Sequence, residues 1–259
     1  MAHNREDGLM AGEAMQSALV TGASAGIGAA TVRALRDAGL EVWAMARRAD
    51  RLEALAAETG CHPVVADVRD GPGLEAAVAD LAPDVLVNNA GLGAGITGLV
   101  NASREDLEKT FGTNVTALLD ICRLVLPGKI ERGRGHVVNL GSVAGLYPIN
   151  STVYGGSKGA VHLISQNLRL ELRGTGIRVT EINPGRVSTE FFQVAVPQGT
   201  NSGTVATAPP IREMGPDDIA GAIRYAVEAP PHVNVSMIEL QPTEQTFGAT
   251  QFDPLDWKE

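Results

Sequence analysis

Residues 17–28, SALVTGASAGIG, join a short apolar run to a glycine-rich turn. Gly22, Gly26 and Gly28 let the backbone turn tightly and approach a phosphate without hindrance from a Cβ atom. The following residues, GIGAATVRALRDAG at 26–39, have the pattern of a helix that ends at Gly39. This order of strand, turn and helix favours a dinucleotide-binding loop, although mononucleotide sites and some structural turns share the glycines.

Apolar runs and longer helical segments alternate along the rest of the chain. The runs are SALVT (17–21), EVWAMA (41–46), HPVVA (62–66), DVLVN (84–88), HVVNLG (136–141), GIRVTEI (176–182) and VSMIEL (235–240). Most are apolar on both faces, as expected for parallel strands covered by helices on either side. Further long helices are expected at 103–128 and 151–174. The sequence therefore predicts an α/β fold: a Rossmann-type doubly wound parallel sheet of seven strands with helices on both faces.

The 259 residues suit one large domain, because no linker interrupts the alternation. We expect residues 1–16 to form a flexible N-terminal arm and residues 17–259 to form a single dinucleotide-binding domain. The segment VAVPQGTNSGTVATAPP at 194–210 has no apolar period and is long for a connection. We interpret its surroundings, about 187–212, as a lid over the substrate.

The composition excludes several classes of partner. A formal net charge of −9 argues against a nucleic-acid groove or an anionic membrane surface. Cys61 and Cys122 show neither a disulfide framework nor a metal-ligand spacing, and the five histidines show no such spacing either, so we expect two buried thiols and no metal. The N-terminal residues do not resemble a signal peptide, and no run approaches ~18 apolar residues, so a cytoplasmic protein is expected.

The end of the second apolar run bears on the choice of cofactor. An acidic residue at this position accepts hydrogen bonds from the free ribose hydroxyl of NAD. Here the residues are Arg47 and Arg48, whose guanidinium groups suit a ribose phosphate. The pair therefore favours NADP, and the alternative is that both arginines are solvated residues at the start of the next helix.

Tyr154 and Lys158 lie four residues apart in an expected helix, and therefore on one face of it. A neighbouring ammonium group stabilises a phenolate and lowers the pKa of the tyrosine toward a value useful for proton transfer. Taken alone, such a pair is more often a solvated pair of side chains.

The order of the motifs resembles the short-chain dehydrogenase/reductase family over about residues 17–240. The motifs are TGASAGIG at 21–28, NNAG at 88–91, Asn114, Ser142, the Tyr154/Lys158 pair and the PG at 184–185. The resemblance implies that Tyr154 is the acid/base, that Lys158 holds the nicotinamide ribose and lowers the tyrosine pKa, and that Ser142 binds the substrate oxygen. Asn114 would hold a water that connects Lys158 to solvent.

The resemblance also implies which residues contact the cofactor. Asn88 would steady the sheet, Asp67 would meet the adenine edge, and Thr189 would contact the nicotinamide amide. The full expected set is Gly22, Ser24, Ala25, Gly26, Ile27, Gly28, Arg47, Arg48, Asp67, Val68, Asn89, Ala90, Gly91, Tyr154, Lys158, Pro184, Gly185, Val187 and Thr189. Structural alternatives remain for three residues: a turn hydroxyl for Ser142, a helix-bending side chain for Asn114 and a turn cap for Asp67.

The substrate is less clearly indicated. Three stretches, LPGKIERGRGHVVNLGSVAG (126–145), EINPGRVSTEFF (181–192) and APPHVNVSMIELQPTEQTF (229–247), resemble the branch of NADP-dependent serine and 3-hydroxy acid dehydrogenases. This resemblance implies a small polar, anionic hydroxy acid or alcohol and the matching aldehyde or ketone. Sulfoacetaldehyde and other small aldehydes or ketones are alternatives, and the long lid departs from the branch. We expect Ser142, Tyr147, Tyr154, Arg186 and Phe191 to contact the substrate, with Phe192 in the lid.

Two questions stay open at this point. Arg186 would bind the anion by a bidentate contact, or it would form a surface ion pair with Glu190. A protein that senses NADP(H) without turnover is the non-enzymatic alternative to an oxidoreductase. The resemblance further implies a homotetramer, or a homodimer, in which the helices at 103–127 and 152–173 pair across subunits.

Overall fold

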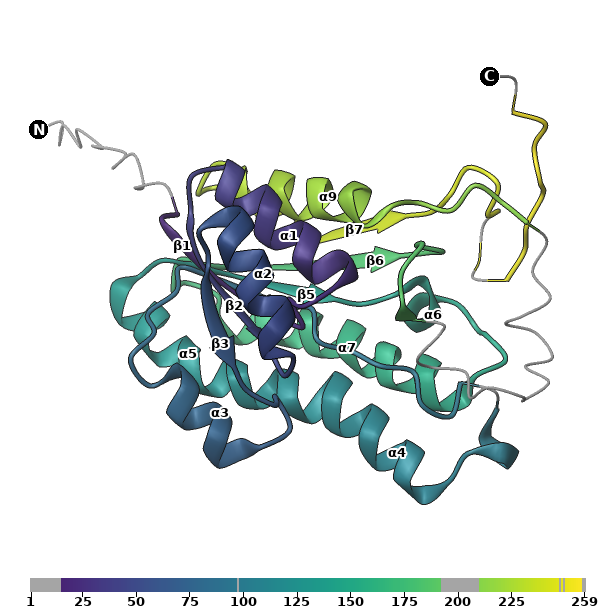
Figure 1. Cartoon of the computed structure of the whole chain (residues 1–259), viewed down its shortest axis with the longest axis horizontal. Helices are drawn as coiled ribbons and strands as arrows, with labels where there is room; N and C mark the ends of the chain where they lie inside the picture. The colour runs from purple at the N-terminus through teal and green to yellow at the C-terminus, as the bar shows by residue number, and fades with distance from the viewer. Residues whose placement is uncertain (1–14, 97, 192–209, 247, 249, 258–259) are drawn as a thin grey trace, which may run out of the picture.

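A single parallel sheet forms the centre of the protein (Figure 1). The computed structural model describes residues 15–96, 98–191, 210–246, 248 and 250–257. The strands are β1 (Ser17–Thr21), β2 (Glu41–Ala46), β3 (His62–Val65), β4 (Val85–Asn88), β5 (Gly135–Leu140), β6 (Ile177–Pro184) and β7 (Met237–Leu240). Their spatial order is β3-β2-β1-β4-β5-β6-β7, and every pairing is parallel. The predicted doubly wound, seven-stranded parallel sheet is confirmed.

Helices cover both faces of this sheet (Figure 1). On one face lie α1 (Gly26–Asp37), α2 (Ala49–Thr59) and α9 (Pro216–Glu228). On the other lie α3 (Gly71–Val78), α4 (Arg104–Phe111), α5 (Ala117–Arg132) and α7 (Thr152–Glu171). Three shorter elements, η1 (Leu99–Asn101), η2 (Gly112–Thr116) and α6 (Val143–Leu146), complete the described helical structure. None of the helices described is long and apolar enough to cross a membrane.

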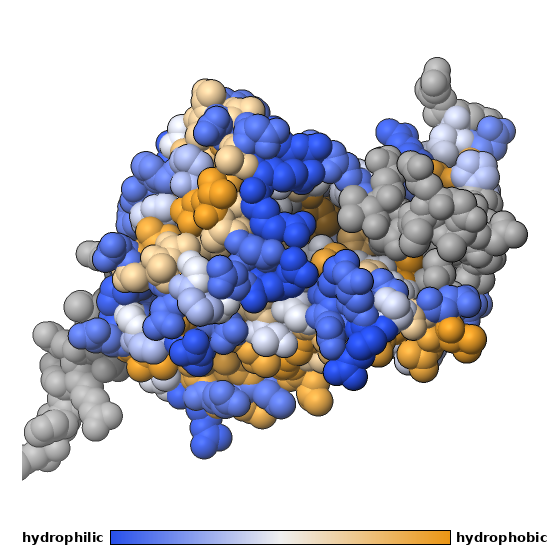
Figure 2. Space-filling view, turned by 60° about the horizontal axis from the view of Figure 1, so that its bottom comes forward, coloured by the Kyte–Doolittle hydropathy of each residue, from blue (hydrophilic) through white to orange (hydrophobic). Residues whose placement is uncertain are grey.

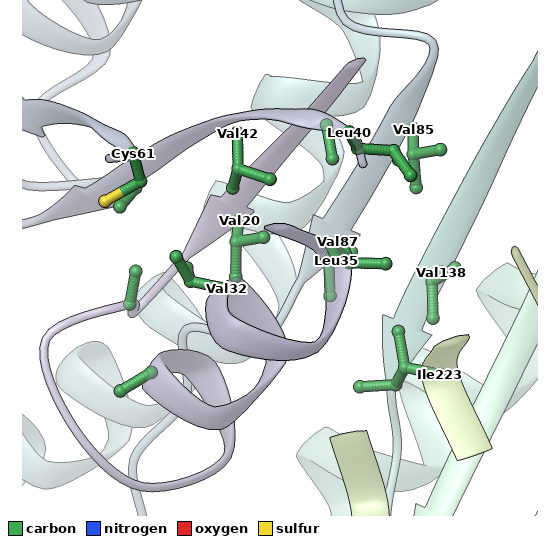
Figure 3. Packing of buried hydrophobic residues seen from close by; sticks show 14 of the residues in the cluster. Val20, Val32, Leu35, Leu40, Val42, Cys61, Val85, Val87, Val138 and Ile223 are labelled. Atoms are coloured by element: carbon green, nitrogen blue, oxygen red, sulfur yellow. The ribbon is translucent and has the colours of Figure 1, made fainter. Parts of the chain in front are cut away.

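The two layers of helices give two apolar clusters. Side chains alternate between the faces of a strand, so Ala18 and Val20 of β1 join the cluster under α1, whereas Leu19 joins the cluster under α5. Figure 3 shows the first cluster, in which Val20, Val42 and Val87 meet the helix residues Val32 and Leu35. This two-sided burial explains why the strands lack the alternation of a half-exposed sheet. Cys61 and Cys122 are buried free thiols, as predicted.

The helix predicted at 103–128 is interrupted and longer than expected. Ser103 caps α4 together with Asp106 in a reciprocal capping box, but η2 then forms a turn of π-helix before α5 begins. Pro127 lies inside α5, which ends at Gly133 in the left-handed conformation. A proline inside a helix costs about 3 kcal/mol, whereas each fully buried Leu, Ile or Val side chain contributes roughly 1.5–3 kcal/mol. Burial of the apolar face of α5 therefore offsets the cost of Pro127, and the helix continues past this residue.

Candidate active site and cofactor site

The glycine-rich turn after β1 packs tightly against the end of β4. Gly22 has a φ of +66°, and a Cβ at this position would lie 2.9 Å from the Cα of Ala90. A Cβ on Gly28 would lie 2.4 Å from the carbonyl oxygen of Gly22. Any larger residue at either position would push the turn open, so both glycines are required by close approach of the backbone.

Asn89, which directly follows β4, holds this turn in place. Its Nδ2 donates hydrogen bonds to the carbonyl oxygens of Thr21, at 2.8 Å, and Gly22, at 3.2 Å. The Thr21 hydroxyl in turn accepts hydrogen bonds from the backbone N–H groups of Asn89 and Ala90. The Asn89 amide therefore holds the loop, and any contact that this residue makes with an adenosine has to leave these bonds in place.

Thr189 lies over the same turn from the segment after β6. Gly26 has a φ of +52°, and a Cβ there would lie 3.3 Å from Cγ2 of Thr189. Two predicted cofactor contacts that are far apart in the sequence are thus side by side. Gly185 is held next to this segment by a hydrogen bond from its N–H to the Leu240 carbonyl oxygen, at 2.7 Å.

The other expected cofactor residues follow the carboxyl ends of the strands. Ala25 is the N-cap of α1 and Ile27 lies in its first turn; Val68 follows β3, Gly91 follows β4, Pro184 ends β6, and Val187 forms a bridge with Met214. The carboxyl ends of parallel strands meet at one edge of the sheet, where ligands of open α/β sheets bind.

Arginine side chains cluster at the ends of β2 and β3. Arg48 donates a hydrogen bond to the hydroxyl of Ser24, at 3.0 Å, and forms an ion pair with Glu190, at 3.2 Å. Arg51 binds the same carboxylate at 2.9 Å. Arg51 is therefore a third cation beside the predicted Arg47 and Arg48, and it lies one helical turn after Arg48.

Asp67 lies between Arg69 and Arg47. Arg69 binds it through the side chain, at 2.9 Å, and through the backbone N–H, at 3.0 Å, while Arg47 lies 3.9 Å away. The hydrogen bond from the Arg69 side chain holds the pKa of this carboxyl below its usual value, against the opposing effect of burial. The backbone contact is the turn-capping arrangement considered as an alternative for Asp67, and it occupies one of the two carboxylate oxygens.

The expected catalytic side chains gather at the end of β5. Lys158 is buried, and its Nζ donates a hydrogen bond to the carbonyl oxygen of Leu140, at 2.7 Å. This Nζ lies 6.0 Å from the ring centroid of Tyr154. The Tyr154 ring packs on Phe191 with 5.3 Å between centroids. Ser142 follows Leu140 by two residues and forms a side-chain hydrogen bond with Tyr154.

Asn114 reaches this cluster because of the π-helical turn η2. Its Nδ2 donates hydrogen bonds to the Leu92 carbonyl oxygen and to the Ser157 hydroxyl, both at 2.9 Å, and its Oδ1 accepts one from the Leu92 N–H. A Cβ on Gly91 would lie 3.4 Å from Oδ1 of Asn114 and 3.6 Å from Nζ of Lys158. Single π-helical turns within longer helices occur frequently at functional sites.

The pKa of the tyrosine departs from the expected direction. Burial raises the pKa of Tyr154 to about 12, and the hydrogen bond with Ser142 lowers it only in part. In the arrangement described, the Lys158 ammonium group bonds to Leu140 rather than to the phenol, so the expected lowering of the Tyr154 pKa by Lys158 stays a prediction. Burial also lowers the pKa of Lys158 to about 8.

Comparison with known proteins identifies the family. Residues 16–199 match the profile described as short chain dehydrogenase. The NADP-dependent 3-hydroxy acid dehydrogenase YdfG of Salmonella typhimurium is 41% identical over 238 residues, which cover 88% of this chain and 96% of that protein. The serine 3-dehydrogenase of Agrobacterium fabrum is 39% identical over 241 residues, which cover 90% of this chain and 96% of that protein.

A solved structure agrees with the sequence comparison. The closed form of serine dehydrogenase complexed with NADP+ superposes with a TM-score of 0.84 at 38% identity, covering 90% of this chain and 97% of that one. The chain belongs to the short-chain dehydrogenase family. The predicted resemblance is confirmed, and the protein is an oxidoreductase of this family.

Arg186 pairs with Glu213 in this structure, and its role as the anion-binding residue stays a prediction. Its guanidinium group binds Glu213, with nitrogen–oxygen distances of 2.9 and 2.7 Å, and lies 5.7 Å from the ring centroid of Phe252. Glu190, the partner considered as the alternative, is bound by Arg48 and Arg51. An anionic substrate at Arg186 would compete with Glu213.

Tyr147 also differs from its expected surroundings. Its hydroxyl donates a hydrogen bond to Oε2 of Glu239, at 3.0 Å. Burial raises the pKa of this tyrosine, and the hydrogen bond adds to the effect. It lines a pocket of about 460 Å³ between α7 and β7, whose lining includes neither Ser142 nor Tyr154. Phe192 and most of the predicted lid, 192–209, lie outside the described residues.

Sequence reasoning overlooked two polar residues of β6. The backbone N–H of Ser142 donates to Oδ1 of Asn183, at 2.9 Å, and Glu181 binds His162. A signal was present, because Glu181 and Asn183 are two residues apart in an apolar strand and so project from one face. No group of three His, Cys, Asp or Glu side chains that could hold a metal ion occurs in the part of the chain that the structure describes.

Proposed function

We propose that this short-chain dehydrogenase uses NADP(H) to interconvert a small polar, anionic hydroxy acid or alcohol with its aldehyde or ketone. The observation that carries the proposal is the convergence of Ser142, Tyr154 and Lys158 at the end of β5, on the sheet edge that also holds the glycine-rich turn. Acid/base groups of this kind serve proton transfer and are not needed to bind a nucleotide.

The residues present fit a dinucleotide with an additional phosphate. The turn at Gly22, Gly26 and Gly28 leaves no room for a Cβ at two of its positions, which is the geometry of a backbone phosphate cradle. Arg47, Arg48 and Arg51 supply guanidinium groups at the end of β2, where NAD-specific proteins carry an acid. NADP(H), when bound, supplies or accepts the hydride, and the protein supplies orientation and protons.

In the proposed mechanism, Tyr154 donates its hydroxyl proton to the substrate oxygen during reduction and takes one up during oxidation. Ser142 stabilises the negative charge that develops on the same oxygen. Lys158 holds a positive charge behind the phenol, which favours the phenolate left after proton transfer. The Ser157–Asn114 hydrogen bond fixes the helix turn between Tyr154 and Lys158 and keeps the two side chains in register.

The substrate class rests on the relatives and on Arg186. The named relatives act on serine and on 3-hydroxy acids, both of which carry a carboxylate. Arg186 is the proposed anchor for this group, and binding would transfer its guanidinium from Glu213 to the substrate. A sulfonate has the same charge and size class, so sulfoacetaldehyde is the second candidate substrate.

The test is a turnover assay with NADPH and NADP+ alongside NADH and NAD+. The alcohols are serine, 3-hydroxypropionate, 3-hydroxyisobutyrate, isethionate and simple secondary alcohols. We expect turnover of a carboxylate substrate with the phosphorylated cofactor. Preferred oxidation of isethionate would indicate the sulfonate reaction, and NADPH binding without turnover of any substrate would favour a sensor and contradict the proposal.

We also propose that the active form is a homotetramer or homodimer paired through the helical layer of α4, α5 and α7. Large apolar side chains are exposed on these helices: Phe111, Leu119, Ile130, Leu163 and Leu170. Figure 2 shows apolar surface between the charged groups on the face turned toward the viewer. Light scattering should give a mass of two or four chains, and a monomer at micromolar concentration would contradict this assembly.

A further inference from the structure

A buried carboxylate lies behind the proposed catalytic lysine. Glu181 of β6 is only 1% exposed. Its Oε2 accepts a hydrogen bond from Nδ1 of His162, at 2.8 Å, and its Oε1 has no hydrogen-bond partner among the described residues. A buried acid that is only half satisfied costs free energy, so its retention calls for a function.

The free oxygen lies against the strand end that holds Lys158. A Cβ on Gly141 would lie 2.7 Å from Oε1 of Glu181. Gly141 is flanked by Leu140, whose carbonyl oxygen accepts the Lys158 hydrogen bond, and by Ser142. The unpaired carboxylate oxygen is therefore next to the backbone segment that accepts the Lys158 hydrogen bond and carries the hydroxyl proposed to bind the substrate.

The partner of Glu181 comes from the same helix as the lysine. Lys158, His162 and Gln166 are spaced by four residues and share one face of α7. Gln166 donates a hydrogen bond to Nε2 of His162, at 2.8 Å, so the ring presents its Nδ1–H to Glu181. The chain of contacts runs from the helix surface through His162 to the carboxylate.

We propose that Glu181, oriented by His162, is a positioning residue whose buried negative charge keeps Lys158 in its ammonium form. This inference rests on the proposed function, in which Lys158 acts as a cation behind Tyr154. Glu181 touches neither the substrate nor the cofactor in this scheme, and it acts through the lysine alone.

The surrounding charges support the assignment. Burial lowers the pKa of Lys158, and the charge of Glu181 opposes this effect. Tyr154 and His162 face this region from α7, while the pocket beyond His162 also contains Arg169, Glu239 and Tyr147. Arg169 donates to the backbone carbonyl oxygens of Val179 and Ser236, and Glu239 binds Tyr147 and Gln241. Of the two carboxylates in this pocket, Glu181 and Glu239, it is therefore Glu181 whose charge raises the pKa of Lys158.

The decisive experiment compares pH profiles of kcat for the wild type and Glu181→Gln with NADPH saturating. Glutamine keeps the shape and the contact with His162 but removes the charge, so the lysine loses its proton at lower pH. We expect the alkaline limb to move down by about one pH unit, with KM changed less than twofold. Glu181→Asp should restore the limb in part, and His162→Asn should move it in the same direction by a smaller amount.

Glu239→Gln is the matched control, because it removes a carboxylate from the same pocket on the neighbouring strand. Its alkaline limb should coincide with that of the wild type. An unshifted limb in a folded Glu181→Gln protein, or an equal shift in Glu239→Gln, would overturn the inference. If Glu181→Gln fails to fold, His162→Asn provides the comparison, and an unshifted alkaline limb in that variant would overturn the inference.

A second measurement does not depend on turnover. Titration of the Lys158 side-chain carbon resonance, assigned with Lys158→Met, should show a lower pKa in Glu181→Gln than in the wild type. If the wild type shows no turnover but the Lys158 pKa is lower in Glu181→Gln, the proposed function is contradicted and the effect of Glu181 on Lys158 is supported. If the wild type shows turnover but neither the pH profile of kcat nor the Lys158 titration shifts in Glu181→Gln, only the effect of Glu181 on Lys158 is contradicted.

Discussion

A cluster of arginines and a single lysine lie along the carboxyl edge of one sheet, and they differ in exposure. The arginines after β2 and β3 are open to solvent, with side-chain exposures of 34% for Arg69, 42% for Arg48 and 66% for Arg47. Lys158, after β5, is 6% exposed. Two charges at 4 Å interact by about 1 kcal/mol in water and by about 4 kcal/mol at an effective dielectric constant of 20. In the proposed function, the exposed charges recognise an anion at one end of the edge, and the buried charge sets a proton equilibrium at the other.

The carboxylates of the two regions differ in the same way. Glu190 binds two exposed guanidinium groups, which lower its pKa through hydrogen bonds, and salt screens such a cluster. Glu181 is buried beside His162 and is not accessible to dissolved ions. The comparison implies that the exposed cluster affects cofactor affinity and its dependence on salt, whereas the buried group affects rate and its dependence on pH.

The largest expected effect lies in the buried region. Tyr154→Phe keeps the ring contact with Phe191 and removes the proton that the mechanism transfers. We expect kcat to fall by roughly 10²–10⁴-fold with NADPH affinity unchanged. Steady-state rates and the quenching of protein fluorescence by NADPH measure the two quantities. Turnover at the level of the wild type would contradict the assignment of Tyr154 as the acid/base.

A smaller effect is expected at the exposed cluster. The double variant Arg47→Ala/Arg48→Ala removes two charge-assisted contacts to a ribose phosphate, each contributing about 1.5 kcal/mol or more. The value of kcat/KM for NADPH should fall about 100-fold, and its dependence on salt should weaken, while the value for NADH changes little. Equal losses for both cofactors would show that the arginines do not recognise the phosphate. Arg33→Ala, whose side chain binds Glu58 away from this cluster, is the control.

The next comparison concerns Arg186, which is intermediate in exposure, at 22% for its side chain. Arg186→Ala should raise KM about tenfold for a carboxylate substrate and much less for a neutral ketone. Glu213→Gln weakens the competing ion pair and should lower KM for the carboxylate substrate. Parallel changes in KM for both substrates in Arg186→Ala would exclude anion recognition by this residue.

The last comparison concerns stability rather than activity, at a second buried cation. Lys129 is fully buried, donates to the carbonyl oxygen of Pro83, and has its pKa lowered by burial to about 7. The unfolded chain binds more protons than the folded chain between this pKa and about 10.4, so stability rises with pH through this window. Relative to Lys129→Met, the wild type should gain up to about 2 kcal/mol between pH 7 and pH 9. Urea unfolding at both pH values measures the difference, and parallel curves would contradict it.

The fold was predictable because its signals are local and repeated. The seven apolar runs, the glycines after β1 and the cap at Ser103 depend on neighbours in sequence, and each is found where the pattern placed it within a few residues. The break at η2 and the continuation of α5 through Pro127 were not predictable, because long-range packing outweighs helix propensity there.

The candidate site shows the same contrast between local signals and long-range packing. The sequence alone identifies the residues expected to bind the cofactor and transfer protons: the glycines of 22–28, the arginines at 47 and 48, and Tyr154 with Lys158 four residues later. Contacts between distant segments set the partners of these residues: Arg186 with Glu213, Lys158 with Leu140, and Glu181 with His162. Spacing within one helix or turn is fixed by backbone geometry, which sequence encodes directly. Ion pairing and pKa depend on burial and on charges brought together from different strands, and these arise only when the sheet and its helices pack.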